Sequence, residues 1–152
     1  QFKQEIQIIS KCFNDVFQEL FGGGGAKLKL RDEKNILDSE IEIVAQPPGK
    51  RLQNISLLSG GEKALTAISL LFGILKRKPC PFCVLDEIDA PLDEGNLEKF
   101  CKFFNNFTDN TQFIIITHRK ATMEVSNSLY GIIMEEKGIS DIVSVRLDDM
   151  AS

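Results

Sequence analysis

Residues 82–87 constrain the fold of this 152-residue chain more than any other stretch. Four apolar residues at 82–85 are followed directly by Asp86 and Glu87. A short, continuous apolar run is typical of a parallel strand that is buried on both faces. Ligand sites in parallel sheets lie at the carboxyl ends of the strands, which is where the two carboxylates fall. The stretch therefore predicts either a strand that carries a catalytic pair or a strand that ends in a solvated acidic turn.

The surrounding segments alternate between helix and strand patterns. Apolar residues recur at three- and four-residue spacing over residues 2–21 and predict one amphipathic helix, which the glycines at 22–25 end. Further helices are predicted at 59–76, 93–107 and 120–126, and further strands at 26–31, 40–45, 113–116, 129–135 and 139–147. The strand–helix–strand alternation in the middle predicts an α/β fold with a parallel sheet and right-handed crossovers.

Composition excludes several classes of protein. The chain is 43% hydrophobic, enough for the core of one domain, and its net charge of −4 excludes a basic DNA-binding module. It has no apolar run near the roughly 18 residues that a membrane span needs, and residues 1–10 do not resemble a signal peptide. We therefore expect a cytoplasmic protein without membrane contact. The basic groups at 27–31 and 76–78 are expected on the solvated surface, although they could contact phosphate.

The four cysteines are Cys12, Cys80, Cys83 and Cys101. Only Cys80 and Cys83, in the Cys80-Pro-Phe-Cys83 segment, have the spacing of a metal or redox site. A structural zinc site needs about four ligands, and no second Cys-x-x-Cys is present. The sequence therefore favours structural thiols over a metal or disulfide role.

A second candidate site begins at Ser59. This serine is a good helix N-cap, and Glu62 three residues later fits a capping box. Gly60 and Gly61 leave the backbone N–H groups of the first turn open to close approach. Together with the helix dipole, these groups can bind an anion. The other reading is an ordinary capped helix that happens to contain glycines.

The order of these two segments along the chain favours the functional interpretation of each over the ordinary one. A Ser-Gly-Gly-Glu helix start, followed by an apolar strand that ends in Asp-Glu, resembles the ATP-binding cassette (ABC) ATPases. Residues 58–62 resemble the ABC signature motif, and residues 82–87 resemble the Walker B strand with its catalytic glutamate. Residues 88–93 resemble the D-loop that follows Walker B, and residues 117–120, Thr-His-Arg-Lys, resemble the H-loop.

Within the ABC class, the chain resembles the C-terminal head lobe of a bacterial SMC (structural maintenance of chromosomes) protein from about Phe21 onward. The stretches that carry the resemblance are Phe-Gly-Gly-Gly at 21–24, Gln-Pro-Pro-Gly-Lys at 46–50, Lys-Pro at 78–79, Pro-Phe at 81–82, Gln-Phe-Ile at 112–114, Met134 and Gly-Ile-Ser at 138–140. The intact Thr-His-Arg of the H-loop favours the bacterial or archaeal branch. Pro91 departs from the alanine that many members carry there, and Gly24-Gly25 extends a glycine run where an acidic residue is common.

The resemblance implies the C-terminal half of a P-loop (ABC-type) ATPase head, with a parallel sheet core flanked by helices. Residues 1–21 would be the end of a coiled coil entering the head, and residues 22–152 would be the lobe itself. A P-loop needs G-x-x-x-x-G-K-[ST], which neither residues 25–27 nor residues 49–51 satisfy. The P-loop would then lie in an N-terminal lobe of the same, longer protein, and this fragment alone would not hydrolyse ATP.

The resemblance also implies roles for the residues at the strand ends. Asp86 would bind Mg²⁺, Glu87 would polarise the attacking water, and His118 would contact the γ-phosphate of the ATP bound by the same head.

Other residues would act across a dimer of heads. Ser59 and Gly61 would reach across to the γ-phosphate on the partner head, and Asp93 would organise the seam between heads. Gly60 and Glu62 would be the other cofactor-binding residues of the signature motif. ATP would join the two heads, and hydrolysis would separate them.

The family's partners are a second SMC head, kleisin and kite-type subunits, and DNA, in a cytoplasmic, nucleoid-associated complex for chromosome condensation and segregation.

Three other interpretations of the chain stay open. The chain could belong to a DNA-repair ATPase with a split head, such as the zinc-hook, RecN or RecF types. It could serve only as a platform for the winged-helix domain of a kleisin. It could also be a thiol-redox protein that uses Cys80 and Cys83.

Overall fold

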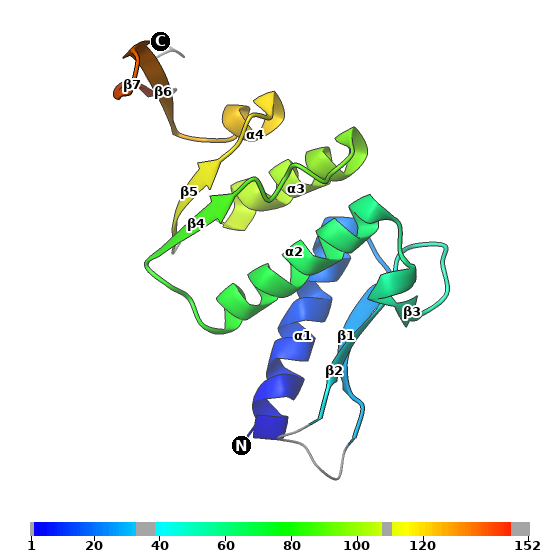
Figure 1. The fold of residues 1–152 in the computed structure, drawn as a ribbon. Helices are drawn as coiled ribbons and strands as arrows, with labels where there is room; N and C mark the ends of the chain where they lie inside the picture. The colour runs from blue at the N-terminus through cyan, green and yellow to red at the C-terminus, as the bar shows by residue number, and fades with distance from the viewer. Residues whose placement is uncertain (1, 33–38, 108–110, 147–152) are drawn as a thin grey trace.

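The computed structural model describes residues 2–32, 39–107 and 111–146. The elements in chain order are α1 (Phe2–Phe21), β1 (Gly25–Leu30), β2 (Ile41–Gln46), β3 (Gln53–Asn54), the 3₁₀ turn η1 (Ile55–Leu57), α2 (Gly60–Arg77), β4 (Phe82–Asp86), α3 (Glu94–Phe107), β5 (Gln112–Ile116), α4 (Lys120–Glu124), β6 (Ser128–Glu136) and β7 (Ile139–Arg146). Figure 1 shows α2 crossing α1 on one side and facing α3 on the other, with β1 and β2 beside α1. The predicted helices and strands are thus confirmed, each within one or two residues of its expected ends.

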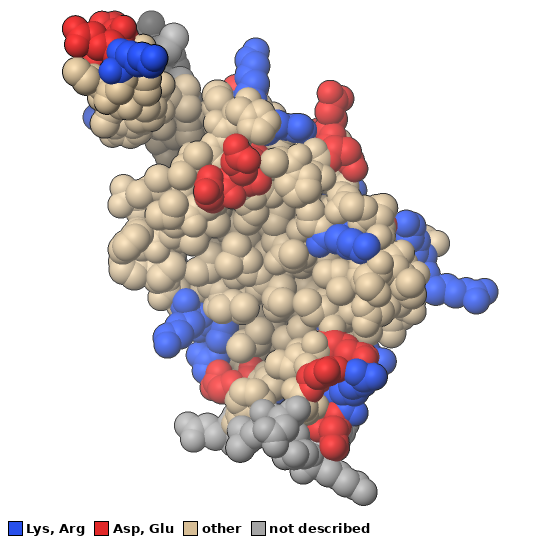
Figure 2. Space-filling view, in the orientation of Figure 1, with Lys and Arg blue, Asp and Glu red and all other residues tan. Residues whose placement is uncertain are grey.

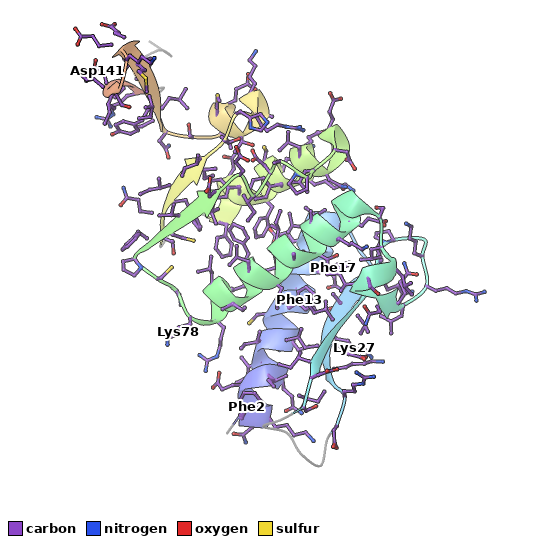
Figure 3. All side chains as sticks on the ribbon, in the orientation of Figure 1. Phe2, Phe13, Phe17, Lys27, Lys78 and Asp141 are labelled. Carbon is purple, nitrogen blue, oxygen red and sulfur yellow. The ribbon has the colours of Figure 1, made fainter. Side chains whose placement is uncertain are left out.

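The core begins where α1 crosses α2. Phe13 and Phe17 of α1 are fully buried and lie where α1 passes behind α2 (Figure 3). Gly73 of α2 allows the close approach, because a Cβ there would lie 2.8 Å from the backbone nitrogen and Cα of Phe13. The amphipathic stripe predicted for residues 2–21 is therefore the face that α1 buries.

The strands β1, β2 and β3 form an antiparallel sheet that packs on α1. Two backbone N–H groups of β1, those of Ala26 and Leu28, donate to the Asn14 and Ser10 side chains of α1, each at 3.0 Å. Gly24, at φ +75°, makes the turn into β1, where any Cβ would collide with the backbone oxygen of Gln46. The helix side chains thus satisfy the edge of β1 that would otherwise be open.

The strands β4 and β5 pair in parallel, with Asp86 opposite Ile116 at the carboxyl end. Aromatic side chains fill the space between this pair and α2. Phe72 is their centre, with ring centroids 4.9–6.4 Å from those of Phe100, Phe103, Phe104, Phe107 and Phe113. The expected parallel pairing is confirmed, and the handedness of the crossover stays a prediction.

The expectation that residues 82–85 form a strand buried on both faces is wrong for this chain. Leu85 is buried, but Phe82 and Val84 are 60% and 52% exposed. On β5, Ile114 and Ile116 are likewise half exposed. The helices α2 and α3 cover one face of the pair, and nothing in the described part of the chain covers the other. Figure 2 shows that the surface over β4 and β5 is almost free of charged side chains.

The last two strands, β6 and β7, form an antiparallel hairpin that stands clear of the other elements (Figure 1). Gly138, at φ +89°, makes the turn predicted at residues 137–138. The hairpin carries large apolar side chains on its surface: Tyr130, Ile132, Ile133, Met134, Ile139, Ile142, Val143 and Val145. An isolated two-stranded hairpin is marginally stable at best in water, so this exposed apolar surface suits packing against another surface.

All four cysteines are free thiols, as the sequence favours. Burial, with a smaller contribution from Cys80, raises the pKa of Cys83. Because the thiolate is the reactive species, this shift disfavours redox or metal chemistry at the Cys-x-x-Cys segment. Among the described residues, no helix has the length and apolar character needed to cross a membrane.

Candidate functional site

Glu87 and His118 meet at the carboxyl ends of β4 and β5. The Glu87 N–H donates to the carbonyl of Ile116 at 2.9 Å, so the residue after β4 is held against the end of β5. Glu87 Oε1 then lies 3.8 Å from Nδ1 of His118. Both side chains are more than 60% exposed, so both are available to a ligand. The parallel pairing thus brings together two residues that lie 31 positions apart in the sequence.

The backbone at Glu87 is unusual. Its φ is +47°, and it is the one non-glycine residue with positive φ in the part of the chain that the structure describes. For a residue with a Cβ this conformation costs about 1–3 kcal/mol, and it persists only where the surroundings impose it. Such strain is concentrated at functional sites in proteins. The strain is consistent with a carboxylate that is aimed by its turn.

Asp86 ends β4 with an exposed side chain. An exposed carboxylate at this position suits Mg²⁺, which takes one or two protein carboxylates and keeps waters and phosphate oxygens as its other ligands. Among the described residues, no three His, Cys, Asp or Glu side chains cluster closely enough to hold a metal by themselves. The donor set therefore fits Mg²⁺ held jointly with a nucleotide, and it does not fit a metal site built by protein ligands alone.

The predicted capping box at the start of α2 is present. Oγ of Ser59 accepts from the Glu62 N–H, and the Glu62 carboxylate accepts from the Ser59 N–H at 3.1 Å and from its hydroxyl at 2.9 Å. The Lys50 ammonium lies 2.8 Å from Glu62 Oε1. The hydrogen bond from Lys50 is the main cause that holds the pKa of Glu62 below its ordinary value; the Ser59 bonds lower it further, and partial burial opposes the shift. Lys50 thus neutralises a carboxylate beside the expected anion site, a role that the sequence did not indicate.

The start of α2 packs directly against the start of α3. Asp93 caps α3, since its Oδ1 accepts from the Asn96 N–H at 2.9 Å. A Cβ on Gly61 would lie only 2.9 Å from Asp93 Oδ2 and from the Asn96 amide nitrogen. A side chain at position 61 would therefore force the Asp93 and Asn96 side chains to shift, so Gly61 favours this close packing in addition to its expected role toward phosphate. The sequence placed Asp93 and Gly61 in separate motifs and did not predict this contact.

The predicted site residues form two groups. Asp86, Glu87 and His118 lie at the strand ends, whereas Ser59, Glu62 and their glycines lie with Asp93 at the helix starts. In the described ranges, no hydrogen bond or ion pair joins one group to the other. A hollow of about 750 Å³ between α3 and α4 touches Asp93 but neither Asp86 nor Glu87. The predicted site residues therefore lie in two separate open groups instead of one enclosed pocket.

Comparison with known proteins identifies the family of this chain. The RecF/RecN/SMC N terminal domain family matches residues 6–141. The chromosome partition protein Smc of Bacillus subtilis is 54% identical over 149 residues, which are 98% of this chain and 13% of that protein. This chain thus spans about an eighth of the length of that relative.

Solved structures agree as well. A structure described as "Structural biochemistry of ATP-driven dimerization and DNA stimulated activation of SMC ATPases" superposes with a TM-score of 0.86 at 37% identity, covering 99% of this chain and 91% of that one. An SMC head bound to the C-winged helix domain of ScpA superposes equally well at 37% identity, but this chain covers only 45% of it. The α/β fold is thus that of one half of an SMC ATPase head, and the chain belongs to the RecF/RecN/SMC family.

Proposed function

We propose that this chain is the C-terminal lobe of the ATPase head of a chromosome-partition SMC protein, and that it supplies half of a composite ATP site. The observation that carries the proposal is the pairing of Glu87 with His118, 3.8 Å apart at the ends of parallel strands. In parallel sheets this edge is where nucleotides bind. Residues 22–152 would form the lobe, and residues 1–21 would be the end of the coiled coil that enters it.

The strand-end group serves the nucleotide of its own head. Glu87 accepts the proton of the attacking water and aims that water at the γ-phosphate. His118 lies beside Glu87 and contacts the γ-phosphate through its ring N–H. Asp86 would hold Mg²⁺, which when bound neutralises phosphate charge. The exposure of Glu87 and His118 supports this proposal, because each must reach a ligand that this chain does not enclose.

The helix-start group serves the nucleotide of the opposite head. The backbone N–H groups of Gly60 and Gly61 in the first turn of α2 suit a γ-phosphate. The Ser59 hydroxyl, which here donates to Glu62, would turn from that carboxylate to join them. Glu62 is already engaged by Lys50, so its charge opposes an approaching phosphate less. Asp93, which packs against Gly61, lies where the two heads would meet.

The missing half of the site is the P-loop lobe of the same protein. This chain has no P-loop motif, and it spans about an eighth of its Bacillus subtilis relative. Its β4–β5 pair leaves Phe82, Val84 and Ile114 exposed, which is an apolar face suited to further strands and helices. We infer that the P-loop lobe covers this face and completes the sheet, so the chain alone should bind ATP weakly and should not hydrolyse it.

The proposed partners follow from the family. ATP bound between two heads would join them, and DNA would be the substrate of the assembled complex. One matched SMC head is bound to the C-winged helix domain of ScpA, and we propose a kleisin of that type and its kite-type subunits as partners here. A pure docking role, without catalysis, is the second candidate; the exposed apolar hairpin of β6 and β7 favours it.

The first experiment measures ATP hydrolysis by this chain, by the P-loop lobe from the same source, and by the two mixed. We expect activity only in the mixture. In the mixture, Glu87→Gln should retain ATP binding and lower the hydrolysis rate by about 10²–10⁴-fold. The control, Glu98→Gln, changes a carboxylate on the exposed side of α3 and should have no effect. Hydrolysis by this chain alone, or full activity of Glu87→Gln, would refute the proposed site.

A further inference from the structure

A buried carboxylate lies between the two loops that carry the proposed site. Asp89 is fully buried, and its Oδ2 accepts hydrogen bonds from the hydroxyls of Thr117 at 2.6 Å and Thr122 at 2.5 Å. Its other oxygen, Oδ1, is also buried and has no partner among the described residues. Asp89 lies on the loop after β4, whereas Thr117 directly follows β5 and Thr122 lies on α4. The carboxylate thus joins the loop after β4 to the β5–α4 segment, 28 to 33 positions later in the sequence.

A second set of bonds joins the same segments. The Arg119 N–H donates to the Thr117 hydroxyl oxygen at 2.9 Å, and the Arg119 guanidinium donates to the carbonyl of Leu92 at 3.1 Å. His118 lies between Thr117 and Arg119, and Asp93 directly follows Leu92. The loop that carries Asp93 and the loop that carries His118 are therefore tied to each other at both ends. A movement of one loop must stretch these bonds or carry the other loop with it.

The chemistry of this link is costly for a purely structural role. A buried carboxylate loses its hydration, and an unpartnered buried oxygen costs about 1–3 kcal/mol. Apolar residues of similar size could fill the same space without this penalty. What Asp89 provides, and an apolar residue cannot, is a directional link of two short hydrogen bonds. Such a link is expected where the orientation of a neighbouring group matters.

We propose that Asp89 is a positioning residue that, through Thr117 and Thr122, holds His118 beside Glu87 and couples it to the loop bearing Asp93. The inference rests on the proposed ATPase function and adds a residue to it. Because Asp93 would lie at the seam between heads, contact with a second head would be transmitted through Asp89 to the γ-phosphate contact. Hydrolysis would then respond to head–head contact without any direct bond between the helix-start group and the strand-end group.

The test uses the full-length protein. Thr117→Val removes one of the two bonds to Asp89, together with the acceptor of the Arg119 N–H, and keeps the branched shape of the side chain. Its matched control is Thr111→Val, which removes a comparable bond, Thr111 Oγ1 to the carbonyl of Cys80 at 2.8 Å, at the opposite end of β5. Thr117→Ser restores the hydroxyl. Steady-state ATP hydrolysis gives kcat and KM for each variant, and thermal unfolding gives its stability.

We expect kcat of Thr117→Val to fall about tenfold with KM for ATP unchanged, since a small misplacement of a catalytic group has effects of this size or larger. Thr111→Val should lose similar stability but keep the kcat of the unaltered protein. Thr117→Ser should recover most of the kcat that Thr117→Val loses. If Thr117→Val does not fold, Thr122→Val removes the other bond and is read in the same way.

Equal kcat values for Thr117→Val and Thr111→Val would overturn the positioning role. The failure of the proposed function is separable, because it would appear as full activity in Glu87→Gln. If Glu87→Gln loses activity and Thr117→Val does not, the proposed ATPase site stands and only the positioning role of Asp89 is refuted.

Discussion

The close crossing of α1 and α2 predicts both the sign and the size of the change in the free energy of unfolding that Gly73→Ala causes. A Cβ on Gly73 would lie 2.8 Å from both the nitrogen and the Cα of Phe13. The opposing atoms belong to the backbone, so no change of rotamer relieves the clash in Gly73→Ala. The two helices must separate by roughly half an ångström or more to regain ordinary contact in a close-packed core.

The magnitude follows from two opposing effects. Overpacking of a well-packed core costs about 1–3 kcal/mol, and here it disturbs an interface that contains the fully buried Phe13, Phe17 and Phe72. Against this, alanine is more favourable than glycine within a helix by about 1 kcal/mol. We expect a net loss of about 1–2 kcal/mol in the free energy of unfolding of Gly73→Ala.

The assay is urea-induced unfolding of this chain, followed by circular dichroism. Gly95→Ala is the matched control, since Gly95 also lies in a helix but its Cβ would lie at an ordinary 3.6 Å from Asp93 Oδ1. The control should be neutral or slightly stabilising. A Gly73→Ala variant that is as stable as Gly95→Ala would show that the α1–α2 contact does not have the close packing described above.

Three further predictions concern the site and its missing partner. Lys50 lowers the pKa of Glu62 in the folded chain. The ion pair therefore contributes its full stability at pH values above the pKa that Glu62 has in the unfolded chain. That contribution is lost as the pH falls through the pKa of Glu62 in the folded chain. Lys50→Met should therefore lower stability at pH 7 by about 0.5 kcal/mol, since Lys50 is half exposed, and the difference should vanish in acid; an equal difference at pH 7 and pH 2 would contradict the pairing. Ser59→Arg should abolish ATP-dependent head dimerisation, measured by gel filtration, and leave ATP binding to single heads intact; normal dimerisation would rule out the contact across heads. Addition of the P-loop lobe should raise the melting temperature of this chain, because it would cover the exposed Phe82 and Val84; an unchanged melting temperature would mean that this face has another partner.

Local signals predicted most of the elements correctly. The capping box at Ser59 and Glu62 is a pattern within four residues, and the structure contains it as expected. The apolar spacing of residues 2–21 likewise predicted the whole of α1. The continuous apolar run at 82–85 was misleading, because a run of this kind reports burial in the complete sheet. In this chain one face of that strand has no neighbour among the described residues.

Sequence alone determined the local structure of this protein and the chemistry available at each turn, because caps, glycines and apolar periodicity act over a few residues. It could also name Asp86, Glu87 and His118 as a set, but only through resemblance to a family. Only the tertiary structure decided that Glu87 lies beside His118, that Gly61 packs on Asp93, and that Asp89 joins the two loops. These contacts depend on the parallel pairing of β4 with β5 and on the packing of α2 against α3, which bring distant residues together in ways that no local pattern encodes.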